Sequence, residues 1–208
     1  MELPAVLSFP ELDPRRLWGG LLAGGAGQRL GGRDKGWLML GGHPLVQHVL
    51  GSMQAHCSQV VISASRNRAA YAALGYPVVA DIVPCAGPLG GMVSLFAAFP
   101  QQLWLMAPCD TLGWPDDLVQ RLWARYQEGR YDVVIVGCEN RLMPVLGLYG
   151  PGCQPQLIRA FQEGERAPCR ALDGLSWDVL WLAPGALINI NTPKALQAAA
   201  AAGGFTPP

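Results

Sequence analysis

Short runs of consecutive apolar residues alternate along this chain with segments in which apolar residues recur at helical spacing. The continuous runs predict buried strands at 17–22, 60–62, 78–80, 103–106 and 133–136. The periodic segments predict helices at 45–53, 67–74, 89–99 and 118–126. Buried strands joined by helices are typical of a mostly parallel sheet covered on both faces. The pattern therefore predicts an α/β protein with a three-layer, Rossmann-like fold.

The pattern changes after Gly137. A strand at 144–149 could run antiparallel to the others, and a helix at 155–162 and a strand at 179–182 follow. Thr192 is a candidate N-cap, because Pro193 suits the first helical position and an alanine-rich segment comes after it. Prolines punctuate residues 1–16, which we expect to form an N-terminal extension. We expect residues 17–208 to form a single domain.

Composition narrows the class of protein. The chain has 208 residues, of which 50% are hydrophobic and 14% charged, and its net charge is zero. This balance argues against nucleic acid or an anionic membrane surface as the main partner. No apolar stretch approaches the roughly 20 residues that span a bilayer, and the N-terminus lacks the features of a secretory signal. The six cysteines form no Cys-x-x-Cys pair, so we expect reduced thiols, no zinc site and a cytoplasmic protein.

Candidate chemistry gathers where the predicted strands end, which is where ligands bind in open α/β sheets. Six glycines lie between Gly24 and Gly36, together with Arg29, Arg33 and Lys35. Glycines let backbone N–H groups approach phosphates closely, so the segment predicts a phosphate-binding loop rather than a flexible surface loop. It is not a Walker A motif, because no Ser or Thr follows Lys35, and it lacks the third glycine of the dinucleotide fingerprint.

Asp110 directly follows the predicted strand at 103–106 and Pro108. A carboxylate at this place can bind Mg²⁺, which takes one or two protein carboxylates together with substrate phosphates. The alternative is that Asp110 only caps the turn that continues through Thr111. Beside a phosphate-binding loop, metal binding is the favoured interpretation.

These residues and several later motifs together resemble the molybdenum cofactor guanylyltransferase family, a branch of the nucleotidyltransferases. The segments that carry the resemblance are Leu22-Ala23-Gly24-Gly25, Arg29, Asp34-Lys35-Gly36, Pro44-Leu45, His48-Val49, Pro77-Val78, Gly87-Pro88-Leu89, Pro108-Cys109-Asp110-Thr111, Gly164-Glu165-Arg166 and Asn189-Ile190-Asn191-Thr192-Pro193. They extend from about Leu17 to Ala200.

The resemblance implies an enzyme that transfers GMP from GTP to molybdenum-bearing molybdopterin and releases pyrophosphate, with Mg²⁺ as cofactor. It implies catalytic roles for Lys35 and Asp110, with Asp110 holding the metal. The residues implied to bind GTP are Leu22, Ala23, Gly24, Gly25, Lys35, Ser63, Asp81 and Asp110. The residues implied to face the pterin are Arg166, Asn189 and Asn191. Transient contacts with molybdoenzymes or other proteins of cofactor synthesis would fit this role.

The chain departs from the family pattern at three positions. Ser63 stands in place of the usual Asn, Met143 in place of a His, and Ala167 in place of a second basic residue. Two alternatives therefore stay open: a nucleotidyltransferase with another base or acceptor, such as a cytidylyl enzyme, and a non-catalytic nucleotide-binding protein that delivers the cofactor. Trp37, inside the glycine-rich segment, is the tryptophan best placed to stack on a ring, although core packing is the more common role.

Overall fold

The protein is described here by a computed structural model, which places residues 16–24, 32 and 34–203. Among these residues a central sheet has the strand order β10-β8-β9-β6-β1-β4-β5. Its strands are β1 (Leu17–Ala23), β4 (Gln59–Ala64), β5 (Val78–Ala80), β6 (Leu103–Pro108), β8 (Val133–Cys138), β9 (Arg141–Tyr149) and β10 (Trp177–Leu182). Neighbouring strands run parallel except at β9, which is antiparallel to both β6 and β8. The predicted mostly parallel sheet is confirmed.

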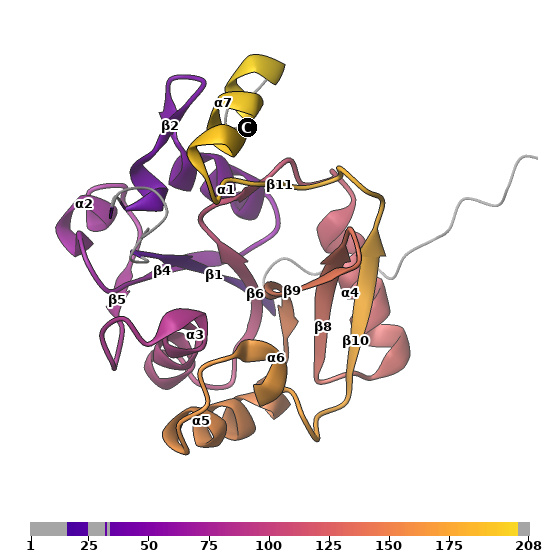
Figure 1. The fold of residues 1–208 in the computed structure, drawn as a ribbon. Helices are drawn as coiled ribbons and strands as arrows, with labels where there is room; N and C mark the ends of the chain where they lie inside the picture. Colours follow the sequence, from indigo (N-terminus) through magenta and orange to yellow (C-terminus); the bar gives the residue numbers. More distant parts are fainter. Residues whose placement is uncertain (1–15, 25–31, 33, 204–208) are drawn as a thin grey trace, which may run out of the picture.

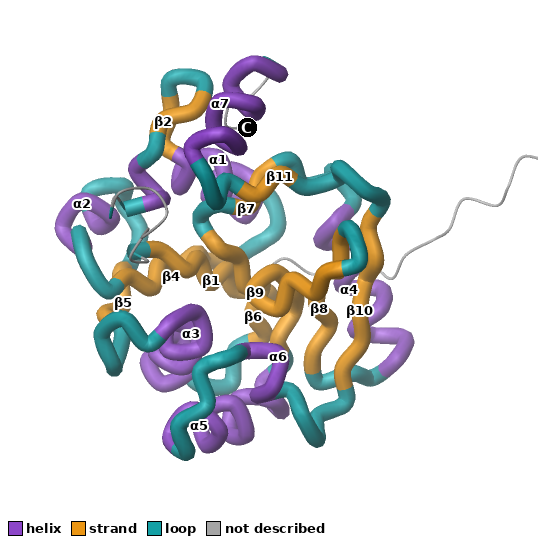
Figure 2. The backbone as a smooth tube through the Cα atoms, in the orientation of Figure 1, coloured by secondary structure: helices purple, strands orange, loops and turns teal. Residues whose placement is uncertain are grey.

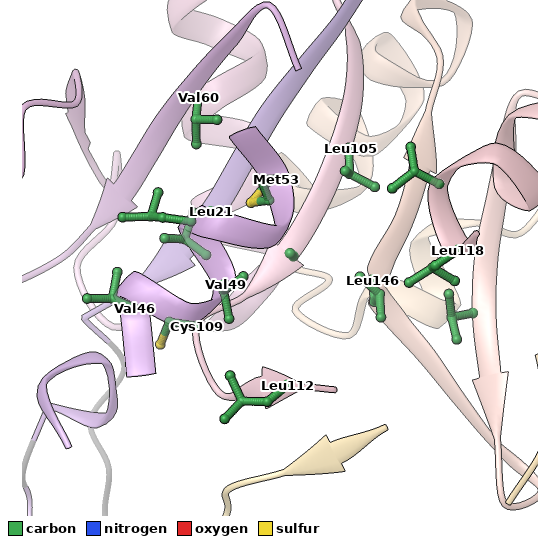
Figure 3. Close-up of a cluster of buried hydrophobic side chains, with 14 of the residues drawn as sticks. Leu21, Val46, Val49, Met53, Val60, Leu105, Cys109, Leu112, Leu118 and Leu146 are labelled. Atoms are coloured by element: carbon green, nitrogen blue, oxygen red, sulfur yellow. The ribbon is translucent and has the colours of Figure 1, made fainter. Parts of the chain in front are cut away.

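Helices cover both faces of this sheet, so the molecule has three layers (Figures 1 and 2). The helices are α1 (Leu45–Gln54), α2 (Arg68–Ala72), α3 (Gly87–Ala98), α4 (Leu118–Gly129), α5 (Gln154–Gln162), α6 (Pro168–Ala171) and α7 (Pro193–Ala202), with two 3-10 turns, η3 (Lys35–Trp37) and η4 (Pro151–Cys153). Buried side chains of α1, α2, α4 and α7 form the core on one face, and those of α3, α5 and α6 form the core on the other. Figure 3 shows part of the first core, where Val46, Val49 and Met53 of α1 lie close to Leu21 of β1.

A two-residue turn explains the direction of β9. Glu139 and Asn140 both have positive φ angles, 51° and 59°, which is the backbone conformation of a type I′ hairpin turn. This turn folds β9 back along β8, with Cys138 paired to Arg141. The far side of β9 then pairs with β6. The hairpin therefore joins the last two parallel strands to the rest of the sheet.

Two short strand pairs lie outside the central sheet, and neither was predicted from the sequence. One joins β2 (Met39–Leu40) to β3 (His43–Pro44), and the other joins β7 (Thr111–Leu112) to β11 (Ile188–Asn189). Helix ends agree with expectation at α7, where Thr192 Oγ1 accepts a hydrogen bond from the Ala195 N–H at 3.1 Å. Helix α4 begins at Leu118, where the predicted helix 118–126 also begins. Within the described part of the chain, no helix has the length and apolar character needed to cross a bilayer.

Candidate functional site

A pocket of about 360 Å³ opens at the carboxyl ends of β1, β4, β5 and β6, as expected for a parallel α/β sheet. Its lining residues are Leu22, Ala23, Lys35, Ser63, Ser65, Asp81, Cys85, Gly87, Pro88, Gly91, Pro108, Cys109, Asp110 and Val145. The first turn of α3 lies in its wall, and the N-terminal end of a helix favours phosphate groups. We call this space the nucleotide pocket, because its shape and polar groups suit a phosphorylated ligand.

Lys35 is the polar centre of this region. Its Nζ donates to Asp110 Oδ2 at 2.7 Å and to Asn191 Oδ1 at 2.6 Å. Both members of the ion pair are partly accessible, with 23% of the Lys35 side chain and 13% of the Asp110 side chain exposed. A charged pair that remains open to a pocket can exchange its internal contacts for contacts with a ligand.

The β7–β11 pair brings Asn191 to this place across about 80 residues of sequence. Asn189 pairs with Thr111, and the Ile190 N–H donates to the Asp110 carbonyl at 2.9 Å. Thr111 Oγ1 also donates to Asn189 Oδ1 at 2.8 Å. These hydrogen bonds hold the segment that contains Asp110 and Thr111 against the segment from Asn189 to Asn191.

A second polar pair lies deeper in the nucleotide pocket. Ser63 is 1% exposed, and its Oγ donates to Asp81 Oδ1 at 2.6 Å. Burial raises the pKa of Asp81 above its usual range, while the hydrogen bond from Ser63 lowers it. The second oxygen of Asp81 can still accept hydrogen bonds from a ligand.

The donor set near Asp110 fits a hard cation held partly by its substrate. Within the described residues, no group of three or more His, Cys, Asp or Glu side chains could hold a metal ion by itself. A single carboxylate at a phosphate pocket matches Mg²⁺ chemistry, in which water and substrate phosphates supply the remaining ligands.

A second pocket of about 540 Å³ lies between the β8–β9 turn, β11 and α7. Asn189 and Asn191 line it, together with Arg141, Met143 and four alanines of α7: Ala195, Ala198, Ala199 and Ala202. We call it the acceptor pocket. Because Asn191 lines this pocket and also binds Lys35, the acceptor pocket borders the nucleotide pocket through the Lys35 contacts.

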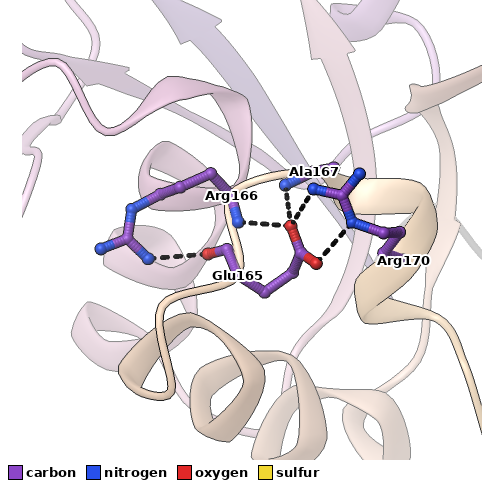
Figure 4. Close-up of polar contacts among 4 residues, drawn as sticks. All are labelled: Glu165, Arg166, Ala167 and Arg170. Atoms are coloured by element: carbon purple, nitrogen blue, oxygen red, sulfur yellow. Dashed lines mark hydrogen bonds and ion pairs between the residues drawn. The ribbon is translucent and has the colours of Figure 1, made fainter.

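Helices α5 and α6 lie on the opposite side of the sheet from β11 and α7 (Figure 1), and Arg166 belongs to the segment that joins α5 to α6. Its guanidinium donates to the carbonyls of Phe161 and Glu165 and stands 4.3 Å from the centre of the Phe161 ring. Figure 4 shows the neighbouring Glu165 carboxylate bound by Arg170 and by the N–H groups of Arg166 and Ala167. These bonds, first among them those from Arg170, lower the pKa of Glu165 to about 2. The structure does not bring Arg166 together with the other two residues predicted to face the pterin.

The structure also places most of the other residues that the sequence singled out. Leu22, Ala23 and Gly24 lie at the end of β1, whereas Gly25, Arg29 and Arg33 fall outside the described residues. Trp37 is half-buried and packs against Tyr71, with ring centres 5.2 Å apart.

Pocket residues that the sequence did not single out include Ser65, Cys85 and Val145. Ser65 comes three residues after the predicted strand at 60–62, and its place near that strand end was the available signal.

A mostly parallel sheet with Gly24 in a left-handed conformation directly after β1, and with Lys35 and Asp110 lining a pocket of about 360 Å³ at its carboxyl edge, defines the class: this is a nucleotidyltransferase. Residues 19–175 match the MobA-like NTP transferase domain, and the chain belongs to that family.

Curated relatives agree with this assignment. The molybdenum cofactor guanylyltransferase of Shewanella loihica is 31% identical over 186 residues, covering 85% of this chain and 92% of the relative. The enzyme of the same name from Serratia proteamaculans is 36% identical over 154 residues, covering 74% and 77%. Among solved structures, molybdopterin-guanine dinucleotide biosynthesis protein A from Archaeoglobus fulgidus superposes with a TM-score of 0.72 at 22% identity, covering 89% of this chain and 97% of that one, which supports the fold.

Proposed function

We propose that this protein transfers GMP from GTP to molybdenum-bearing molybdopterin, in the cytoplasm, and releases pyrophosphate. The observation that carries the proposal is the position of Lys35, which binds Asp110 of the nucleotide pocket and Asn191 of the acceptor pocket. Two anionic phosphates must meet in this reaction. A site that joins them needs positive charge, hydrogen-bond donors and alignment rather than a covalent nucleophile.

GTP occupies the nucleotide pocket in this proposal. Leu22, Ala23, Gly24 and Gly25 contact the nucleotide, and the ammonium of Lys35 neutralises triphosphate charge as a point contact. Asp81 accepts from guanine, whose base edge presents two neighbouring N–H donors, and the hydroxyl of Ser63 holds the carboxylate in place. Loss of such a buried hydrogen bond costs about 1–3 kcal/mol, so Asp81 contributes to the choice of base.

Asp110 holds Mg²⁺ in this proposal. When bound, the ion stabilises the negative charge that develops on phosphate oxygens during displacement. The carboxylate of Asp110 would hold the ion, and the ammonium of Lys35 would bind the triphosphate, because both side chains line the same pocket.

The pterin lies in the acceptor pocket, with its terminal phosphate directed at the α-phosphorus of GTP. Asn189 and Asn191 supply hydrogen bonds, and the short alanine side chains of α7 leave room for the ring system. Arg166 belongs to a segment across the sheet from this pocket, and its guanidinium is bound to the Phe161 carbonyl, so we give it a smaller share of this binding than the two asparagines. Any contact with molybdoenzymes would follow release of the finished dinucleotide.

The test is pyrophosphate release with Mg²⁺ and molybdopterin, using GTP or CTP, in the wild type and in Asp110→Asn. We expect GTP to be strongly preferred, and the variant to lose about 4 kcal/mol of transition-state stabilisation, which is roughly a thousandfold in rate. Its melting temperature should stay nearly unchanged, because Asn keeps the volume of Asp.

Asp117→Asn is the matched control, since Asp117 belongs to an exposed ion pair with Arg121 and should lose neither activity nor stability. Near wild-type turnover in Asp110→Asn would refute its metal-binding role. Equal rates with GTP and CTP would refute the guanylyl assignment, and nucleotide binding without pyrophosphate release would favour a delivery protein.

A further inference from the structure

A buried carboxylate stands directly beside Lys35 in the chain. Asp34 is 8% exposed and accepts hydrogen bonds from three donors: the Tyr71 hydroxyl at 2.7 Å, the Asn67 side-chain amide at 3.0 Å and the Gly36 N–H at 3.2 Å. Two of the three donors come from α2 and its N-cap, more than 30 residues further along the chain. The segment carrying Lys35 is therefore attached to a separate helix.

The bond from the Gly36 N–H makes Asp34 the N-cap of the single turn Lys35–Trp37. This hydrogen bond joins Asp34 to Gly36 and so fixes the backbone of Lys35, which lies between them. The direction of the Lys35 side chain therefore depends on the Asp34 carboxylate. The Lys35 ammonium binds both Asp110 and Asn191 at 2.7 Å or less, and this geometry requires a fixed backbone at Lys35.

Tyr71 holds this turn by contact as well as by its hydrogen bond. A Cβ atom added at Gly36 would lie 2.4 Å from the Tyr71 hydroxyl oxygen, so the turn and the tyrosine can approach this closely only because residue 36 is glycine. The Tyr71 ring itself is fully buried and packs against Trp37.

Asn67 is placed for the same task. Its backbone has a φ of 54°, and its side chain makes no capping bond to α2, although it occupies the N-cap position. Asn favours capping and tolerates this left-handed conformation. The side-chain amide of Asn67 instead donates to Asp34, which directly precedes the turn Lys35–Trp37.

We propose that Tyr71 and Asn67 are positioning residues for Lys35, acting through the carboxylate of Asp34. They touch neither the nucleotide nor the acceptor; they fix the turn from which Lys35 reaches the triphosphate. The inference rests on the proposed role of Lys35 in GTP binding. It predicts that removing the Tyr71 hydroxyl harms GTP binding only as long as Lys35 is present.

The test is a double-mutant cycle on GTP affinity, measured by calorimetry with Mg²⁺ in the wild type, Tyr71→Phe, Lys35→Ala and the double variant. Phe keeps the buried ring and removes only the hydroxyl. We expect Tyr71→Phe to weaken GTP binding about fivefold, the size of one lost hydrogen bond. In the Lys35→Ala background the same change should have almost no effect, because residues that act through one another are not additive.

Tyr76→Phe is the control, since Tyr76 lies just after α2 and outside the Asp34 contacts, and GTP affinity should be unchanged. Asn67→Gly repeats the cycle at an exposed position whose backbone glycine adopts readily, in case Tyr71→Phe fails to fold. An equal loss in both backgrounds, or no loss in either, overturns the positioning role and leaves the role of Lys35 intact. Unchanged affinity in Lys35→Ala removes the proposed role of Lys35 itself, and this inference with it.

Discussion

Asp81 and Ser63 form a pair in which one hydroxyl donates a hydrogen bond to one partly buried carboxylate. Burial raises the pKa of Asp81, and the Ser63 hydroxyl opposes that rise by donating to the charged form. The two side chains lie at the ends of neighbouring parallel strands, so the sheet itself keeps them together. In the proposed function, base recognition by Asp81 would therefore depend on a side chain that need not touch the base.

Ser63→Ala should make GTP binding more sensitive to acid. In the proposed role of Asp81, guanine N–H groups bind the ionised carboxylate, so affinity should fall as pH decreases through the pKa of that carboxyl. Without the hydroxyl this pKa rises further, and the loss of affinity should begin at a higher pH than in the wild type. Calorimetry between pH 5 and pH 8 measures both curves, and titration of GTP itself cancels in the comparison. Affinity losses that begin at the same pH in the two proteins would contradict this coupling between Ser63 and the proposed base contact of Asp81.

At the scale of elements, strand β9 depends on close backbone contact with β8. A Cβ atom built on Gly147 would lie 2.3 Å from the Val134 carbonyl oxygen, which is backbone and cannot turn away. Gly147 also lies next to the bulge between Ile135 and Val136, where the register of the two strands shifts.

Gly147→Ala should therefore destabilise the protein by about 2 kcal/mol or more, as expected when a well-packed site is overfilled. For a domain of this size, that corresponds to a decrease of several degrees in the melting temperature. Gly152→Ala is the comparison variant, because its added Cβ would meet only the Asp132 side chain, which can move. Similar melting temperatures for the two variants would contradict the proposed backbone clash.

Most of the elements could be predicted from the sequence, whereas their pairing could not. The continuous apolar strands and the Thr192 cap leave local signals, and the structure contains both. The order of the sheet and the β7–β11 pair depend on residues far apart in the chain, which no local pattern connects. For the same reason Lys35 and Asp110 could be singled out as candidates, but the bond from Lys35 to Asn191 could not. Tyr71 gave only the signal of an apolar helix position, although its hydroxyl holds the Asp34 carboxylate.

At the scale of the whole molecule, the nucleotide pocket draws its walls from four strands and from α3, so ligand binding should stabilise the entire fold. A ligand at about 100 times its Kd contributes roughly 2.7 kcal/mol of stability. We expect GTP with Mg²⁺ to raise the melting temperature by about 5–10 °C. A chelator should remove much of this increase, because the triphosphate then lacks its cation beside Asp110. An equal increase with and without Mg²⁺ would show that the metal contributes little to nucleotide binding.

The position of β9 also has a consequence for the newly made chain. Strands β1, β4, β5 and β6 are complete once residue 108 has been synthesised, and they include most of the nucleotide pocket. Until β9 pairs with it, β6 has one edge whose backbone N–H and C=O groups lack partners. Side chains along this strand, such as Trp104 and Met106, are buried in the folded protein. An open apolar edge is a template for pairing with another chain. Truncated or stalled chains that end before Tyr149 should therefore associate with one another, and β9 is the segment whose arrival ends that exposure.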